Sequence, residues 1–291
     1  PAGKACETCQ RLAQGLVRRG VAVMVHDPIA HGERSQYWDP LIGCSRVGSP
    51  TAELATVEGQ CALVGLDLVS YQIWDAIRAL DYMCLRDDVD LTRLGVTGWG
   101  PGGLLALLVF ALEERVRAAV PICGVTSLEA WLAAGLHRPR GYAQPAILAE
   151  GIDHADLCIA CAPRPLRLCA AERDVLPIEG TRATFQEAKR IYSLLGAGDC
   201  LDLVVAEGEG GCVKPLREAV YQWFNLWLGN PSLDHVETSA EFEAPERLLC
   251  TPDGQVASLG SRTVFCFTRQ LAELLPPAPP ELETRGDAER W

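Results

Sequence analysis

Residues 94–103, with the sequence LGVTGWGPGG, have the composition of a buried strand that runs through a glycine turn into an apolar helix. This is the layout of a nucleophile elbow, in which a G-x-S-x-G turn lifts a serine hydroxyl above the strand ends so that it can attack an acyl carbon. Here Gly100 occupies the serine position and brings no attacking atom. The next residue is Pro101, which has no backbone N–H to donate to an oxyanion. The turn therefore predicts a scaffold for acyl transfer that lacks its nucleophile and one oxyanion donor.

Other side chains of catalytic type follow predicted strands. His31, Cys123 and Asp174 each come after an apolar run, and the carboxyl ends of parallel strands are where such folds bind ligands. One hypothesis is a relocated Cys-His-Asp system. The simpler interpretation is a buried core cysteine and a loop histidine, since nothing in the sequence marks the thiol as activated. Glu207 and Glu209 with Asp174 offer a further alternative, an acidic pocket for a cation, although solvated loop carboxylates are far commoner.

The glycines of the turn permit another function. Gly98, Gly100 and Gly103 spell G-x-G-x-x-G between a strand and a helix, which is the phosphate fingerprint of dinucleotide-binding domains. A helix N-terminus there could hold an anion. However, residues 122–126 (ICGVT) contain no acid for the ribose, and Pro101 removes a donor from the loop. A dinucleotide-binding domain is therefore an alternative rather than the leading hypothesis.

The chain has 13 cysteines, scattered through predicted strands and helices rather than spaced as a disulfide framework. The pairs Cys6 with Cys9 and Cys158 with Cys161 could together supply four thiolates to zinc. The first pair should begin a helix at one end of the sheet and the second should precede a strand at the other end. We therefore expect buried free thiols and predict no metal and no cofactor.

The elements that must position these residues alternate along the chain. Five short apolar runs predict strands, at residues 21–25, 93–97, 118–122, 166–170 and 201–206. Helical patterns cover residues 11–19, 51–86 (with a break at Gly59 or Gly65), 102–115, 181–195 and 214–228. Near-continuous apolar strands separated by helices predict the α/β class, with a mostly parallel sheet and helices on both faces.

Smaller features complete this outline. In the long helical stretch, Trp74, Ile77, Leu80 and Tyr82 are expected on the buried side. Residues 127–156 lose periodicity and suggest an excursion over the sheet edge, of the kind that forms lids. Residues 263–267 suggest one more strand, and the proline-rich end should be poorly ordered.

Four motifs, in this order, carry a resemblance to a known family. They are DPIAHGERS at 27–35, YQIWDAIRALD at 71–81, VDLTRLGVTG at 89–98 and PIEG at 177–180. Over roughly residues 1–230 the chain resembles the acetylxylan-esterase-like, or dienelactone-hydrolase-like, branch of the α/β-hydrolases. That resemblance implies an α/β-hydrolase fold and a Ser-Asp-His triad in that chain order. It assigns the acid to Asp174, the nucleophile position to Gly100, and the base position to Gly210.

The resemblance also implies a gap at the front. The chain opens at Pro1, at the helix that follows the third strand of the family, so we expect a truncated chain without its N-terminal strands. The strand at 21–25 would then lack its neighbour, which a missing segment or a partner chain would have to supply. We predict a hydrolase-like domain at 1–230 and a C-terminal extension, partly disordered, at 231–291.

The composition limits the partners. A formal net charge of -12 disfavours nucleic acid and anionic membrane, which are bound by clusters of lysine and arginine. The longest apolar run, residues 102–112, is about half of what a bilayer crossing needs. The leading hypothesis is thus a catalytically inactive homologue that acts in binding or scaffolding, with a small-molecule or carbohydrate ligand. The alternative is an active carboxylic-ester hydrolase acting on short acyl esters of polysaccharide through residues not identified here.

Overall fold

A four-stranded parallel sheet forms the centre of the computed structural model, which describes residues 3–135, 147, 149–229, 234–275 and 284–286. The strands are β3 (Leu94–Trp99), β4 (Val116–Ile122), β5 (Leu166–Arg173) and β6 (Leu201–Glu209). They lie in the order β3-β4-β5-β6, and every neighbouring pair is parallel. The last four predicted strands are confirmed, and so is the α/β class.

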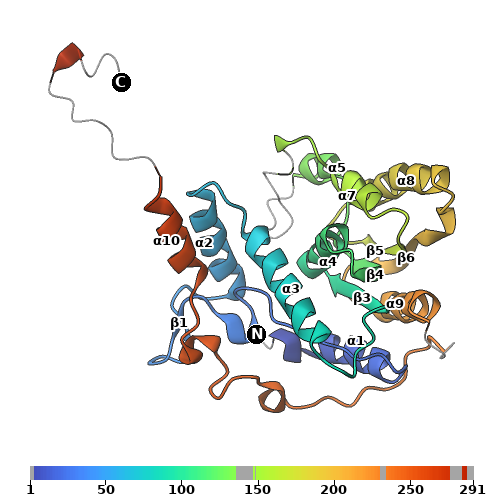
Figure 1. Cartoon of the computed structure of the whole chain (residues 1–291), viewed down its shortest axis with the longest axis horizontal. Coiled ribbons are helices and arrows are strands. Elements are labelled where there is room, and N and C mark those ends of the chain that lie inside the picture. Colours follow the sequence, from blue (N-terminus) through green and yellow to red (C-terminus); the bar gives the residue numbers. More distant parts are fainter. Residues whose placement is uncertain (1–2, 136–146, 148, 230–233, 276–283, 287–291) are drawn as a thin grey trace.

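Helices cover both faces of this sheet (Figure 1). On one face lie α1 (Glu7–Val17) and α9 (Lys214–Trp227); on the other lie α4 (Pro101–Leu112), α7 (His154–Ala160) and α8 (Ile178–Leu194). In β4, Val120 and Ile122 belong to the core on the α1 and α9 side, whereas Ala119 belongs to the opposite core. The period-two alternation of a strand therefore builds two apolar layers from one apolar run.

The first predicted strand is wrong. Residues 21–25 form no ladder and precede the sheet as an unpaired segment. Val21 and Val23 pack against the α1 and α9 core, whereas Met24 and Val25 are exposed. The run has the alternation of a strand, but a strand also needs a hydrogen-bonding neighbour. In the described part of the chain this sheet ends at β3, and residues 21–25 pair with none of its strands.

A second layer packs beside the sheet from α2 (Pro50–Ala62), α3 (Leu68–Cys84) and α10 (Val264–Ala272). The long helical stretch divides at Gly65, whose φ of 74° suits glycine, while Gly59 lies inside α2 without breaking it. The expected buried side of α3 is partly wrong. Val69, Ile73 and Leu80 pack toward the sheet side, whereas Trp74 and Tyr82 are 59% and 56% exposed.

The predicted strand at 263–267 is also wrong, because these residues begin α10. Thr263 is the N-cap, and Val264 and Thr268, one turn apart, are the buried positions. A run of β-branched and aromatic residues favours a strand only where a sheet edge is available. This run meets α2 instead, and its i, i+4 spacing buries one helical face.

The remaining elements are short. They are η1 (Gly3–Ala5), η2 (Gly32–Arg34), β1 (Trp38–Asp39), β2 (Cys44–Ser45), α5 (Leu128–Ala133), η3 (Gly198–Cys200), η4 (Pro245–Leu248) and η5 (Val256–Leu259). Strands β1 and β2 pair antiparallel. The predicted lid excursion includes residues 136–146 and 148, which lie outside the described residues, as do residues 276–283 and 287–291 of the proline-rich end.

A strap, defined here as residues 234–259, returns from α9 along α1 toward α10 (Figure 1). Arg19 of the α1 end donates to the carbonyls of Asp234 and Val236, and Gln10 exchanges hydrogen bonds with Glu243. The strap thus joins the C-terminal part of the chain to its first helix.

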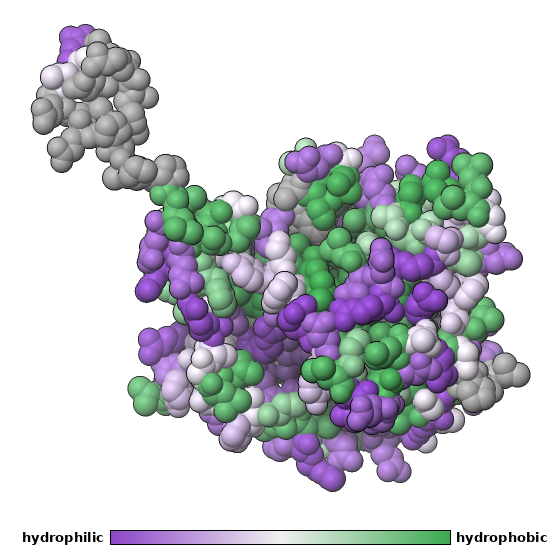
Figure 2. Space-filling view, viewed as in Figure 1, coloured by the Kyte–Doolittle hydropathy of each residue, from purple (hydrophilic) through white to green (hydrophobic). Residues whose placement is uncertain are grey.

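Hydrophobic and hydrophilic side chains are mixed on the surface. Figure 2 shows hydrophobic and hydrophilic residues interspersed over one face, with hydrophilic ones gathered across its middle. Among the described helices, none combines the length and the apolar character needed to cross a bilayer.

Candidate functional site

The turn between β3 and α4 has the geometry of an elbow. Gly100 is the N-cap of α4 with φ 60° and ψ −130°, a conformation that ordinary residues adopt only under strain. Its N–H donates to the carbonyl of Ile122 at 2.8 Å, and its carbonyl accepts from Gly103 at 2.9 Å. Pro101 occupies the first turn of the helix. The strand-turn-helix context required of an elbow is present, without a hydroxyl or a following N–H.

Close packing explains the flanking glycines. A Cβ on Gly98 would lie 2.4 Å from the carbonyl oxygen of Gly102, and one on Gly103 would lie 2.6 Å from that of Ile122. A Cβ on Gly124, after β4, would lie 2.5 Å from the Leu104 nitrogen. These glycines let β3, β4 and α4 approach one another, so the G-x-G-x-x-G pattern has a packing explanation that needs no phosphate.

The proposed acid and base positions meet at the ends of β5 and β6. The N–H of Gly210 donates to the carbonyl of Arg173 at 3.2 Å, and a Cβ on Gly210 would lie 2.5 Å from Asp174 Oδ1. That oxygen accepts from the N–H groups of Val175 and Leu176 at 2.5 and 3.4 Å, whereas Oδ2 is buried without a hydrogen-bond partner. The carboxylate therefore faces the residue position that the resemblance assigns to the base.

Cys123 lies between these two parts. It follows Ile122, which binds the elbow, and its Sγ donates to the carbonyl of Gly211 at 3.7 Å. Its φ of 49° is unusual for a residue with a side chain. Burial, reinforced by the neighbouring Asp174, raises the pKa of the Cys123 thiol to about 12. The side chain is thus a buried, protonated thiol at neutral pH rather than an activated nucleophile.

His31, the histidine of the hypothetical Cys-His-Asp system, bonds within its own loop instead. The Nδ1 atom of His31 is 3.2 Å from the carbonyl of Ile29, in its own loop. No hydrogen bond between described residues joins His31 to Cys123 or Asp174. The structure thus places Cys123 beside Asp174 but does not bring the histidine to them.

The metal alternatives fail on geometry. In the described ranges, no three histidine, cysteine, aspartate or glutamate side chains gather closely enough to hold an ion. Cys6 caps α1 and accepts from the N–H of Cys9, whereas Cys158 and Cys161 are buried in the core under α7 and α8. The two pairs do not form one four-thiolate site. Glu209, of the acidic alternative, is paired with Arg173 at 3.2 Å.

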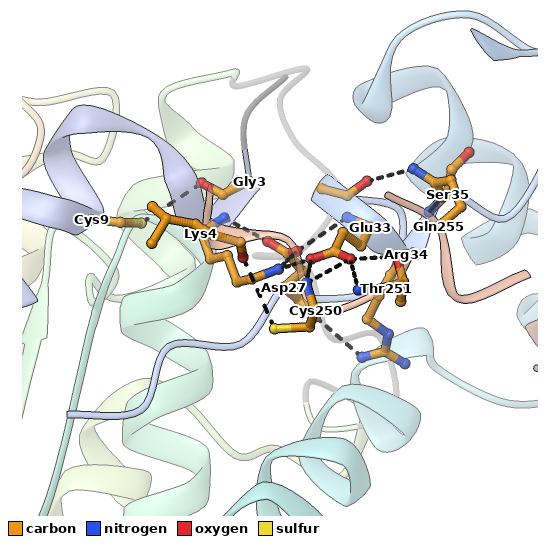
Figure 3. Close-up of polar contacts among 12 residues, drawn as sticks. Gly3, Lys4, Cys9, Asp27, Glu33, Arg34, Ser35, Cys250, Thr251 and Gln255 are labelled. Carbon is orange, nitrogen blue, oxygen red and sulfur yellow. Dashed lines mark hydrogen bonds and ion pairs between the residues drawn. The ribbon is translucent and has the colours of Figure 1, made fainter. Parts of the chain in front are cut away.

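Sequence reasoning missed a buried ionic cluster that we call the latch, comprising Lys4, Asp27, Glu33 and Thr251 (Figure 3). Asp27 accepts from the backbone N–H and the Nζ of Lys4 at 2.6 and 3.2 Å. Glu33 accepts from Lys4 Nζ, from Thr251 N and Oγ1 at 2.8 and 2.5 Å, and from Cys250 N. The latch thereby joins η1, the DPIAHGERS loop and the strap. Of its four members, only Asp27 and Glu33 belong to a motif named in the sequence, DPIAHGERS.

The latch shifts the titration of Glu33. Burial alone would raise the pKa of this carboxyl, but hydrogen bonds from Lys4, Thr251 and the Cys250 backbone outweigh it and lower the pKa to about 2. Glu33 is only 5% exposed, so its charge is held inside the protein by these donors.

His154 is a second residue that the sequence did not indicate. It is 2% exposed, and its Nδ1 accepts from the N–H of Thr126 at 3.2 Å, just beyond β4. Burial lowers its pKa, so the ring is neutral, and its Nε2 is buried without a partner. The observed contacts make it an anchor between α7 and the segment after β4.

The comparisons agree with this geometry. A model of the acetyl xylan esterase family matches residues 69–127, which contain α3, β3, the elbow and β4. The structure superimposes on Methylesterase BT1017 with a TM-score of 0.68 and 20% identity, over 94% of this chain and 56% of that one. The fold is therefore an α/β-hydrolase fold. A Pyrococcus furiosus esterase, Pf2001, gives a TM-score of 0.53 at 15% identity, over 78% of this chain and 79% of that one.

A curated relative matches part of this chain. "Putative hydrolase YtaP" of Bacillus subtilis (strain 168) is 29% identical over 168 residues, which are 57% of this chain and 56% of that protein. The chain thus spans a little over half the length of this relative and of Methylesterase BT1017.

Proposed function

We propose that this esterase-like chain is catalytically inactive and acts by binding or scaffolding. The observation that carries the proposal is the elbow itself: Gly100 holds the φ of 60° and ψ of −130° at the N-cap of α4 but offers only a hydrogen where attack would begin. Pro101 withholds the adjacent donor, and Gly210 puts no imidazole beside Asp174. Three of the groups needed for acyl transfer are therefore missing from positions whose backbone is intact.

Cys123 does not replace them. Its pKa of about 12 leaves a negligible thiolate fraction at pH 7, and its Sγ donates to the carbonyl of Gly211. The dinucleotide alternative has no supporting observation either, because the segment after β4 has no acid and the glycines are accounted for by packing. A titration that showed NAD(P) binding would revive it.

Hydrolysis of p-nitrophenyl acetate tests the proposal. We expect the purified chain and its Asp174→Asn and Cys123→Ser variants, prepared in parallel, to hydrolyse the ester at the rate of buffer alone. Turnover by the parent chain that either substitution abolishes would show an active carboxylic-ester hydrolase, and would overturn the proposal. Turnover equal in all three preparations would come from general surface catalysis or a contaminant and would leave no role for this site.

A further inference from the structure

A second site lies between α3 and α10, apart from the elbow. It is an open cavity of about 550 Å³. Three segments line it. They are the loop with Ile29, Arg34 and Gln36, helix α3 with Ser70, Tyr71, Trp74 and Asp75, and the α10 region with Arg262, just before the helix, and Phe267, within it. Val69 and Ile73, on the opposite side of α3, pack into the core with α4. Helix α3 therefore separates the cavity from the elbow.

The walls of the cavity are aromatic. Trp74 is 59% exposed although it sits in the middle of α3, and Phe267 is 38% exposed. Tyr71 and Phe267 meet with ring centroids 6.0 Å apart at 34°. The guanidinium of Arg78 lies 4.5 Å from the Trp74 ring centroid and holds that ring in place. Large exposed rings beside a concavity offer a flat apolar surface to a ligand ring.

The charge of the cavity is opposite in sign to that of the chain. Arg34 is paired with Asp75 at 2.7 Å, so these two charges cancel. Burial lowers the pKa of His26, next to this pair, which leaves the imidazole neutral near pH 7. Arg262 stacks over Phe267 at 4.9 Å from the ring centroid and hydrogen-bonds the Cys266 side chain; among the ion pairs of the described residues, none joins it to a carboxylate. The lining therefore carries one net positive charge, on a chain whose formal charge is -12.

Hydrogen bonds to neighbouring segments fix the polar side chains of the cavity in place. Gln36 Oε1 accepts from the N–H of Val264 at 3.0 Å, which fixes the start of α10 against the loop. Arg34 also donates to the carbonyl of Asp27 at 3.2 Å, a residue of the latch. The cavity is thus built on fixed elements from both ends of the chain, which lowers the ordering cost of binding.

We propose that this cavity binds a carboxylated six-membered ring. The ring would stack on Trp74 and Tyr71, and its single carboxylate would pair with Arg262 at the rim, next to the Arg34 and Asp75 pair. One carboxylate neutralises the net charge of the lining, whereas a polyanion would meet the negative charge of the rest of the chain. A sugar acid and an aromatic acid both combine a six-membered ring with one carboxylate, and titration with each of them distinguishes the two.

Isothermal titration of the full chain with glucuronate and benzoate, and with the neutral glucose and benzamide, tests the proposal. We expect saturable binding of at least one acid, with a Kd on the order of millimolar for so open a site. The matching neutral ring should bind at least about fivefold more weakly, and added KCl should weaken only the acid. Preference for glucuronate identifies a sugar acid, and preference for benzoate an aromatic acid.

Two matched pairs of variants locate the site. Arg262→Gln should weaken the acid about fivefold or more, whereas Arg269→Gln, on the same helix and paired with Glu273, should leave the Kd unchanged. Trp74→Ala should weaken it by roughly three- to tenfold, whereas Tyr82→Ala, equally exposed on α3, should have no effect. Thermal melts confirm that each variant is folded. Equal affinity for acid and neutral rings, equal loss in a variant and its control, or no saturation by either acid would overturn the proposal.

Discussion

Replacing Glu33 by glutamine tests whether the latch stabilises the fold. The pKa of this carboxyl falls from its ordinary 4.5 to about 2 in the folded chain. A difference of roughly 2.5 pKa units, at about 1.36 kcal/mol per unit, corresponds to about 3 kcal/mol of folding free energy. The amide of Glu33→Gln can keep part of the hydrogen bonding to Thr251 and Cys250, but it loses the ionic contact with Lys4. We therefore expect a loss of about 2–3 kcal/mol at pH 7.

The pH dependence gives this prediction a distinct signature. Because the folded pKa is depressed, the contribution of Glu33 is complete above about pH 4.5 and is lost as the pH falls toward 2. The parent chain and Glu33→Gln should consequently differ most at neutral pH and converge in acid. Urea unfolding at pH 7 and at about pH 3, followed by circular dichroism, measures both differences.

A surface carboxylate supplies the control. Glu243 pairs with Arg247 at 2.7 Å, but both side chains are about half exposed or more. Glu243→Gln should therefore cost less than about 1 kcal/mol at either pH. If Glu33→Gln cost no more than this control at pH 7, or if its deficit stayed the same at pH 3, the assignment of stability to the latch would be refuted.

Two further predictions concern the elbow region. Gly103→Ala should destabilise the fold by about 2 kcal/mol or more, because its Cβ would press on the Ile122 carbonyl. Gly102→Ala, in open space on the same helix, should be neutral or stabilising by up to about 1 kcal/mol. Chemical denaturation compares the two variants, and equal changes in the free energy of unfolding would contradict the close packing at Gly103. Iodoacetamide at pH 8 should modify the exposed Cys44 at least about tenfold faster than Cys123, because the Cys123 thiol is buried with a pKa of about 12. Peptide mass spectrometry follows the modification of both cysteines, and comparable rates would show that Cys123 is activated.

The order of apolar runs was enough to predict the sheet, because β4 and β5 are buried along most of their length and all four strands carry a mainly apolar run. The family resemblance assigned the acid and base positions to Asp174 and Gly210, and both residues follow neighbouring parallel strands in the structure. Residues 21–25 carry the same signal and still form no ladder. Pairing depends on a second strand, which local composition cannot supply.

What sequence reasoning missed depends on contacts across the length of the chain. Glu33 and Thr251 are 218 positions apart, and neither has a local pattern that announces a buried ionic cluster. Trp74 was expected in the core because a helical period places an aromatic residue there by default. Trp74 is instead 59% exposed and lines the cavity beside α10, a helix that was itself taken for a strand. One wrong element therefore concealed the cavity beside it.

The two glycines at the proposed triad positions differ in how firmly the surrounding structure requires them. Gly100 has φ 60° and ψ −130°, the strained conformation that an elbow imposes on its nucleophile, so a serine there would carry a backbone cost of about 1–3 kcal/mol. At Gly210 the obstacle is steric, because a Cβ would sit 2.5 Å from Asp174 Oδ1 and push the carboxylate off the N–H groups that hold it. A histidine at that position would displace the acid it needs. At the proposed base position, therefore, the present packing opposes a side chain.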